Sequence, residues 1–447
     1  MIKNILRLLL IIFFSSMLKA ENLSEVVKLA FDNNNNYKSK VEDFNAEYAY
    51  KGLANSYLLP KLDLQGNAGF NQGSKSYSSS SQAALAKEYS YGLADGISYG
   101  VTINLTQPLY SPEAWAYYSQ GKLTAQMAEI TLDKEKNNLI LKITEAYFAV
   151  LSAQNDMEYS NSKVEYLQNY MNEVTKKADV GQAKRVDVEE VRAKYELAKY
   201  ESLVTGNNLK VKQDALNKLL NTEIVSFNKV KEDLINLELQ EKDITTWKER
   251  SKQQNLDVLA TRLSVLIADE QIKIASSSYY PTLTVVGSIG GNGGSDPILK
   301  DNFKEDSASI GVVLNMNLYE GGASKNQRKQ AQYKKKSADY TLLELENTVE
   351  NITTQYYLNV DNGLSQIEAL KQSLISSEKS LQSAERSYSV GLKTTTDVLI
   401  ATESYYSAKR DYSTSKYNFL LSVLSLKAVS GVISNEDVML INNFLEQ

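Results

Sequence analysis

Hydrophobic and polar residues alternate along four short segments of the chain, and this alternation predicts four β-strands. The strands are expected at about 61–72, 96–107, 282–290 and 308–319. The clearest pattern places apolar side chains at every second position, namely at Ile97, Tyr99, Val101, Ile103 and Leu105. Because successive side chains of a strand point to opposite faces, each strand would have one apolar and one polar face.

Two kinds of structure use strands with this pattern. One is a half-buried sheet in a soluble domain. The other is a membrane β-barrel, because about ten residues are enough for a tilted strand to cross a bilayer. The segments 71–96 and 291–306 are polar and rich in glycine and serine, so we expect them to be exposed hairpin loops.

Most of the remaining chain has helical patterns. No proline follows Pro112 until well past residue 178, and Ser111 stands before it as a candidate N-cap, so one very long helix is predicted there. A heptad repeat near the C-terminus places large side chains at Val398, Tyr405, Tyr412, Phe419 and Leu426. Small residues alternate with them, including Ala401 and Ala408. Large and small side chains in this arrangement are typical of coiled-coil packing.

The chain contains an internal two-fold repeat. Two Val-Gly pairs, each followed by an aspartate, recur at an offset of 210 residues: Val180, Gly181 and Asp187 match Val390, Gly391 and Asp397. Repeats of this length indicate a duplicated half-protein rather than a solenoid. We expect a first repeat at 21–220, a connecting segment at 221–250, a second repeat at 251–430 and a C-terminal tail at 431–447.

Residues 1–20 have the pattern of a secretory signal peptide. Lys3 and Arg7 supply a positive start, residues 8–14 are entirely apolar, and the small residue Ala20 suits a cleavage point. An exported chain, together with the polar loops, favours the membrane barrel over the soluble sheet.

Composition excludes several classes of function. The chain has 447 residues, no cysteine and no histidine, which removes thiol nucleophiles, Cys/His zinc sites and histidine-based triads. We find no supported carboxylate pair, phosphate loop or dinucleotide fingerprint, so an enzyme is the weakest hypothesis and no cofactor or metal is expected. The net charge of -5 makes nucleic acid a poor partner.

Several stretches resemble the TolC family of outer-membrane channel proteins. They include "ENLSEVVKLAFDNN", "LNMNLYEGGASKNQRKQAQY" and "ERSYSVGLKTTTDVLIATESYYSAKRDY", and the similarity covers nearly the whole chain after Ala20. The resemblance implies a mainly α-helical protein with a membrane β-barrel. Three protomers would each give four strands to a shared 12-stranded barrel and their helices to a long periplasmic tunnel. The connecting segment and the C-terminal tail would lie at the tunnel's equator.

The same resemblance implies a function and its partners. The chain would be a passive exit duct in the cell outer membrane, for drug efflux, type I protein secretion or both. Its partners would be a periplasmic adaptor (membrane fusion) protein, an inner-membrane transporter of RND, ABC or MFS type, and outer-membrane lipid. The alternative is a secreted structural or adhesive coiled-coil trimer without a pore.

The resemblance also gives roles to individual residues. Asp397 matches a ring of aspartates at the pore aperture, while Asp187, Tyr388 and Lys393 match residues that hold the tunnel tip closed. An adaptor would dock on the helical turns at Val180, Gly181, Val390, Gly391 and Leu392. The chain departs from the family pattern at Ile400, where some members have a second ring aspartate, and at Lys393, which replaces an arginine. It also departs at Val186, which replaces a threonine.

Structural roles compete with these functional ones. Thr394 and Asp397 form a capping-box pattern, so the competing role for Asp397 is to support the start of a helix, and the two roles can coexist. Lys184 stands at the equivalent capping position before Asp187, which makes a cap less expected there, and an ordinary surface ion pair with Lys184 or Arg185 is the alternative. Gly181 and Gly391 are most simply helix-terminating glycines.

Overall fold

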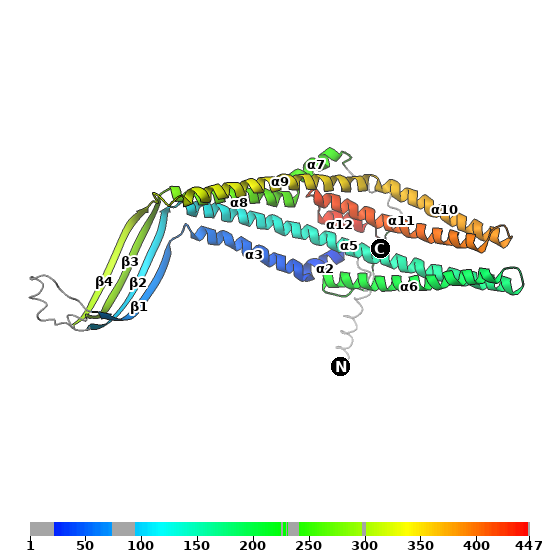
Figure 1. The fold of residues 1–447 in the computed structure, drawn as a ribbon, viewed down its shortest axis with the longest axis horizontal. Helices are drawn as coiled ribbons and strands as arrows, with labels where there is room; N and C mark the ends of the chain where they lie inside the picture. Colours follow the sequence, from blue (N-terminus) through cyan, green and yellow to red (C-terminus); the bar gives the residue numbers. More distant parts are fainter. Residues whose placement is uncertain are drawn as a thin grey trace, which may run out of the picture. The chain divides into compact units, whose positions relative to one another are not determined.

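The computed structural model describes residues 22–73, 94–224, 227–228, 230, 241–296 and 301–445. The expected signal peptide at 1–20 lies outside these residues. The elements follow the predicted order (Figure 1). Those of the first half are α2 (Leu23–Asn33), α3 (Asn35–Ser56), β1 (Lys61–Gly73), β2 (Ala94–Tyr110), α5 (Pro112–Asp179) and α6 (Arg185–Leu220). Those of the second half are α7 (Ile244–Gln254), α8 (Leu256–Ser276), β3 (Thr282–Asp296), β4 (Asp301–Asn315), α9 (Ala323–Asp361), α10 (Gly363–Ser389), α11 (Thr395–Val429) and α12 (Asn435–Asn442).

The chain divides into two compact units, and each contains segments from both halves of the repeat. One unit, which we call the helical unit, contains the chain up to Phe44, Ile130–Ala260 and everything from Leu343 onward. The other, which we call the sheet unit, contains Asn45–Glu129 and Thr261–Leu342. The predicted repeat boundaries describe sequence duplication rather than these units, and they remain a prediction.

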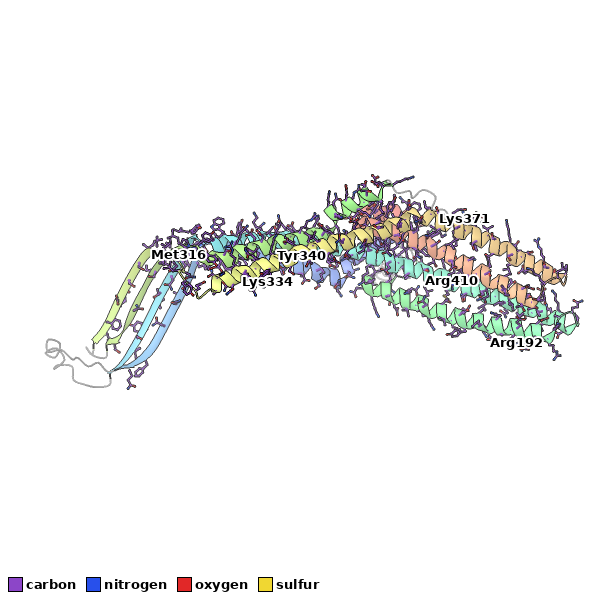
Figure 2. The ribbon with its side chains drawn as sticks, turned by 45° about the horizontal axis from the view of Figure 1, so that its top comes forward. Arg192, Met316, Lys334, Tyr340, Lys371 and Arg410 are labelled. Atoms are coloured by element: carbon purple, nitrogen blue, oxygen red, sulfur yellow. The ribbon has the colours of Figure 1, made fainter. Side chains whose placement is uncertain are left out.

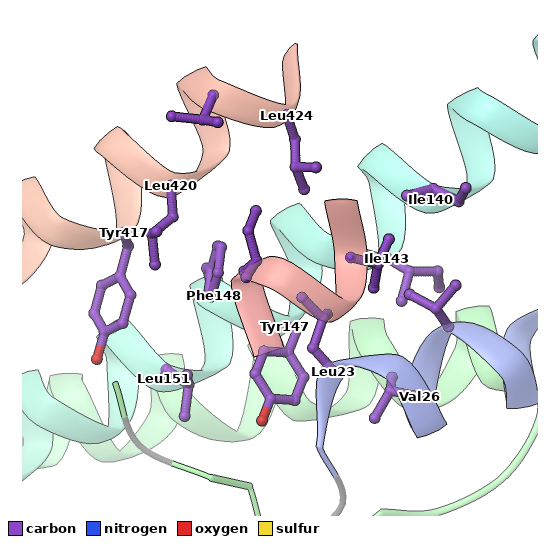
Figure 3. Close-up of a cluster of buried hydrophobic side chains, with 14 of the residues drawn as sticks. Leu23, Val26, Ile140, Ile143, Tyr147, Phe148, Leu151, Tyr417, Leu420 and Leu424 are labelled. Atoms are coloured by element: carbon purple, nitrogen blue, oxygen red, sulfur yellow. The ribbon is translucent and has the colours of Figure 1, made fainter. Parts of the chain in front are cut away.

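The helical unit has two clusters of buried side chains. The larger cluster joins α2, α5, α11 and α12, and it includes Leu23, Ile143, Tyr147, Leu420 and Leu424 (Figure 3). The second cluster joins α5, α6, α10 and α11, and the heptad positions Val188 and Val398 lie in it. The predicted coiled-coil seam is therefore confirmed, because the large heptad residues Val398, Phe419 and Leu426 are all buried.

The duplication extends to individual hydrogen bonds. Asn34 separates α2 from α3, and its side-chain nitrogen donates to the Leu219 carbonyl at 2.7 Å. Asn255 separates α7 from α8 in the same way and donates to the Val429 carbonyl at 2.8 Å. Each asparagine also accepts a backbone N–H from the helix that follows it. The two halves therefore fix the break in a helix with the same side chain.

The four strands form one antiparallel sheet in the order β1-β2-β3-β4. β1 and β2 lie close to their expected bounds, and the long α5 begins as predicted, with the Ala114 N–H donating to the Ser111 hydroxyl at 3.2 Å. β3 and β4 differ from the prediction. β3 continues to Asp296 rather than to about 290, and β4 spans Asp301–Asn315 rather than about 308–319.

Pairing explains both differences. The glycines after residue 289 suggest a loop, yet they pair with β2 on one side and β4 on the other. The Tyr99 ring occupies the place where a side chain at Gly293 would stand. β4 ends at Asn315 because its partner there is Thr282, the first residue of β3. Met316, labelled in Figure 2, follows the end of β4 and has no strand partner beside it in the described ladder.

Candidate functional site

The sheet separates its side chains by polarity. Its register aligns Leu62 with Leu105, Leu105 with Gly287, and Gly287 with Ile310. These positions share an apolar face, on which Ile310 is 80% exposed and Leu62 is 73% exposed. The members of this face include Leu62, Leu64, Ile103, Leu105, Leu283, Val285, Ile310, Val312 and Leu314. So many exposed apolar side chains on one face do not suit a sheet in water.

The opposite face of the sheet is polar. It includes Asp63, Asn104, Thr284, Ser288 and Ser309. The Asn104 side chain donates to the Asp63 carboxylate at 3.0 Å, and the hydroxyls of Ser288 and Ser309 lie 2.8 Å apart. The sheet thus matches the alternation predicted from the sequence, with lipid-like surroundings suited to one face and water suited to the other.

The described part of the chain contains no helix that has both the length and the apolarity to cross a membrane. Among the same residues, no group of three or more acidic side chains is arranged to hold a metal ion.

The two Val-Gly turns of the helical unit have the same geometry. Gly181 and Gly391 both have φ +77, a left-handed conformation that glycine adopts without strain. The Gln182 N–H donates to the Lys177 carbonyl at 2.7 Å, and the Leu392 N–H donates to the Ser387 carbonyl at 2.8 Å. This six-to-one bond closes the end of a helix in a Schellman motif. The helix-terminating role of both glycines is therefore confirmed.

The turns expose apolar side chains instead of covering them. Val180 is 70% exposed, Val390 69% and Leu392 81%. A turn needs only its glycine and its hydrogen bonds, so these three side chains contribute little to holding it together. They form a surface on which an apolar partner can pack.

Both aspartates after the turns cap the next helix. One Asp397 carboxylate oxygen accepts the Thr394 N–H at 2.8 Å and the Thr394 hydroxyl at 2.7 Å. These bonds, the backbone one first, hold the pKa of the Asp397 carboxyl below its usual value. The Asp187 carboxylate accepts the Lys184 N–H at 3.1 Å in the same way. The cap at Asp187 is the weaker of the two, as expected, because Lys184 makes no side-chain cap bond, whereas the Thr394 hydroxyl also accepts the Asp397 N–H at 3.2 Å.

The three expected tethering residues do not meet within one chain. Tyr388 packs its ring edge-on against Tyr170 of α5 at 5.7 Å, and the Lys177 ammonium lies 4.6 Å from its ring centroid. Lys393 acts electrostatically on Asp397. Within the described part of the chain, no hydrogen bond or ion pair joins Asp187 to Tyr388 or Lys393. Tethering through these residues stays a prediction about neighbouring copies.

Other contacts near the turns were missed from the sequence. The Thr396 hydroxyl donates to the Glu190 carboxylate at 2.9 Å, which joins the first turn of α11 to the first turns of α6. The Tyr166 hydroxyl donates to Glu385 at 2.6 Å, which joins α5 to α10. One signal was available, because Glu190 is the repeat counterpart of Ile400 and the two halves differ there in charge.

A buried lysine forms another of these unexpected links. Lys163 of α5 donates to Glu201 of α6 at 2.8 Å and to Glu403 of α11 at 2.9 Å, and its side chain is 8% exposed. Burial opposes the charge on Lys163, but the two carboxylates outweigh it and raise its pKa. The Lys163 side chain thus links α5, α6 and α11, three of the helices that lead into or out of the two turns.

Replacing Lys163 with methionine is expected to destabilise the helical unit by about 1–3 kcal/mol, because two charge-assisted bonds are lost and both glutamates are still partly solvated. The midpoint of thermal unfolding in detergent measures the loss. Because the folded-state pKa of Lys163 is raised, its contribution is complete below the usual lysine pKa of 10.5 and disappears as the pH rises through the raised value.

Lys199→Met is the matched control for this substitution. Lys199 pairs with Glu196 at 3.0 Å, but both side chains are about half exposed, so a negligible change is expected. Equal shifts for the two variants would contradict a special role for Lys163.

Comparisons with known proteins agree with this geometry. The outer membrane efflux protein family matches residues 27–222 and 247–432. Outer membrane protein TolC of Escherichia coli is 28% identical over 97% of this chain and 87% of its own. Alkaline protease secretion protein AprF of Pseudomonas aeruginosa is 23% identical over 92% of this chain and 85% of its own. The solved CmeC outer membrane channel of Campylobacter jejuni has a TM-score of 0.78 at 18% identity, covering 95% of this chain and 90% of that one.

A two-faced sheet of four strands, joined in one chain to long coiled-coil helices that end in paired turns, is the protomer fold of outer-membrane channel proteins. The family match covers most of both halves, so the chain belongs to the outer membrane efflux protein family.

Proposed function

We propose that the chain is the outer-membrane exit duct of a tripartite export system that serves drug efflux, type I protein secretion or both. The duct is passive, and its energy comes from an inner-membrane transporter of RND, ABC or MFS type through a periplasmic adaptor. The description of the matching family as outer membrane efflux proteins supports the first branch, and the name of a similar protease secretion protein supports the second.

The structure of the sheet is the main support for this proposal. Within the described ladder β1 and β4 are edge strands, and each has one side without a partner. Unpaired backbone groups cannot be left in lipid, and the smallest membrane barrels have eight strands, so one chain cannot close a barrel. Three copies supply twelve strands. The apolar face then meets outer-membrane lipid, and the polar face lines a water-filled pore.

The exposed turns support the adaptor's place in the system. Val180, Val390 and Leu392 offer apolar contacts on the two turns, and the repeat gives each protomer two such surfaces. A trimer therefore has six similar turns. The aspartates that follow them, Asp187 and Asp397, would lie around the same axis, with Tyr388 and Lys393 as the tethers between neighbouring protomers.

The mature protein is expected to be a trimer in detergent, with a mass of about three chains, and to form pores in planar bilayers. Light scattering gives the mass, and single-channel recording gives the conductance. A stable water-soluble monomer would remove the shared barrel. A trimer without conductance would favour the structural or adhesive alternative.

A further inference from the structure

Two grooves of the sheet unit lie on opposite faces of α8. The first has a volume of about 650 Å³, and the α8 residues Ser264, Ala268 and Gln271 line it. The second has a volume of about 570 Å³, and Glu270, Lys273 and Ser276 line it. At 100° of rotation per residue, these two sets point away from each other.

The sheet identifies the side on which each groove lies. Thr282 and Asn315 line the first groove, and both belong to the polar face of the sheet. The second groove shares Tyr280 with the first but otherwise lies on the other side of α8, and we infer that this is the side of the apolar face. It also lies level with the strand ends, because Pro112 follows the last residue of β2 by two positions and Tyr280 precedes β3 by two.

The second groove combines aromatic rings with a positive charge. Trp115 and Tyr280 are each 54% exposed, and Arg328 of α9 completes the lining. No described carboxylate pairs with Arg328, whereas the other cation of the groove, Lys273, is bonded to Glu270 at 2.8 Å. The charge of Arg328 is therefore available to a ligand.

The start of α9 makes this region strongly basic. Residues 323–336 contain six lysines and arginines and no acidic residue. Lys325 and Lys329 lie within one turn of Arg328 and are exposed. Lys334, labelled in Figure 2, lines the first groove on the other side of the helix. The positive charge thus adjoins the apolar side of the sheet at the level where its strands end.

We propose that this groove binds an anionic phospholipid of the leaflet that faces the helices. The phosphate contacts Arg328, the rings of Trp115 and Tyr280 lie at the headgroup level, and the acyl chains run along the apolar face of the sheet. A soluble anion would gain nothing from the apolar face, which is why a lipid fits better. This inference rests on the proposed barrel, because it requires the apolar face to meet lipid.

Trp115 supplies the probe. The chain has two tryptophans, and Trp247→Phe leaves Trp115 as the single emitter. The trimer is placed in bilayers that contain a small, equal fraction of phosphatidylglycerol or phosphatidylcholine, each brominated close to the headgroup. We expect brominated phosphatidylglycerol to quench Trp115 about fivefold more effectively, the preference that one cation near the surface provides. If Trp247→Phe does not assemble, the difference between the native protein and Trp115→Phe gives the same signal.

Two variants, each of which removes one positive charge, test whether the lipid preference arises at this groove. Arg328→Gln is expected to remove most of it, and Lys334→Gln, which changes a residue of the first groove, is expected to leave it intact. Equal loss in both variants would reveal a diffuse charge effect and overturn the groove. Equal quenching by both lipids in the native protein would also overturn it.

Two further outcomes distinguish a bound lipid from a free anion and from a sheet that lies outside the membrane. If soluble glycerol phosphate abolishes the preference, the groove is a site for a free anion and the lipid proposal fails. If neither lipid quenches Trp115, the strand ends do not lie at the membrane surface, and the proposed barrel fails instead.

Discussion

Replacing Gly391 with proline is expected to abolish adaptor-dependent export while the trimer still assembles. Proline fixes φ near -65°, so it cannot adopt the +77° that Gly391 has, and it removes the N–H that donates to the Tyr388 carbonyl at 3.1 Å. The turn must then open, although Val390, Gly391 and Leu392 themselves belong to neither buried cluster. Gly181→Pro makes the same change in the other half and should have the same effect. Export is measured in cells that lack the native protein, as drug sensitivity and as secreted protein.

Leu392→Asp tests whether export depends on the apolar surface of the turn, because it changes an exposed side chain and leaves the backbone of the turn in place. Leu392 is 81% exposed, so a charge there leaves the helix end intact but places a carboxylate where an apolar partner would pack. We expect export to fall at least tenfold, with normal trimers and normal conductance, whereas Leu392→Met should export normally. Normal export by Leu392→Asp and by both proline variants would show that the adaptor docks elsewhere.

The elements that depend on short-range patterns could be predicted from the sequence. The heptad of α11, the long α5 with no proline after Pro112, and the two glycine turns each rest on residues within a few turns of one another, and the structure confirms them. Because the chain contains an internal repeat, a prediction made for one half could also be made for the other. Local signals were sufficient because a helix end is closed by its own backbone.

The elements that depend on distant partners could not be predicted in the same way. The ends of β3 and β4 are set by the register of the ladder, in which Thr282 meets Asn315, and glycine-rich sequence gives no sign of such pairing. The link from Thr396 to Glu190 depends on how α6 and α11 rotate toward each other. Lys163 is an ordinary surface lysine by sequence, and only the packing of three helices buries it.

The two roles of Asp397, helix cap and aperture ring, can be separated by two substitutions. Asp397→Asn keeps an oxygen to accept the Thr394 N–H but removes the charge. Thr394→Ala removes the hydroxyl that accepts the Asp397 N–H at 3.2 Å but keeps the charge. If Asp397 only caps α11, both variants lose about 1 kcal/mol of local stability at most, and neither changes the ions that pass.

If three copies of Asp397 surround the pore, Asp397→Asn is expected to weaken block by a trivalent cation at least tenfold, or about 1.4 kcal/mol, and to reduce cation preference. Thr394→Ala should leave both properties unchanged. The hydrogen bonds from Thr394 lower the pKa of the Asp397 carboxyl, whereas repulsion among three like charges would raise it, so block by the native protein should fade as the pH falls and the carboxyls take up protons. Ile400 supplies no second ring, so the block should be modest. Bilayer recordings under a salt gradient decide between the roles, because equal reversal potentials and equal block in native and Asp397→Asn channels would leave only the helix cap.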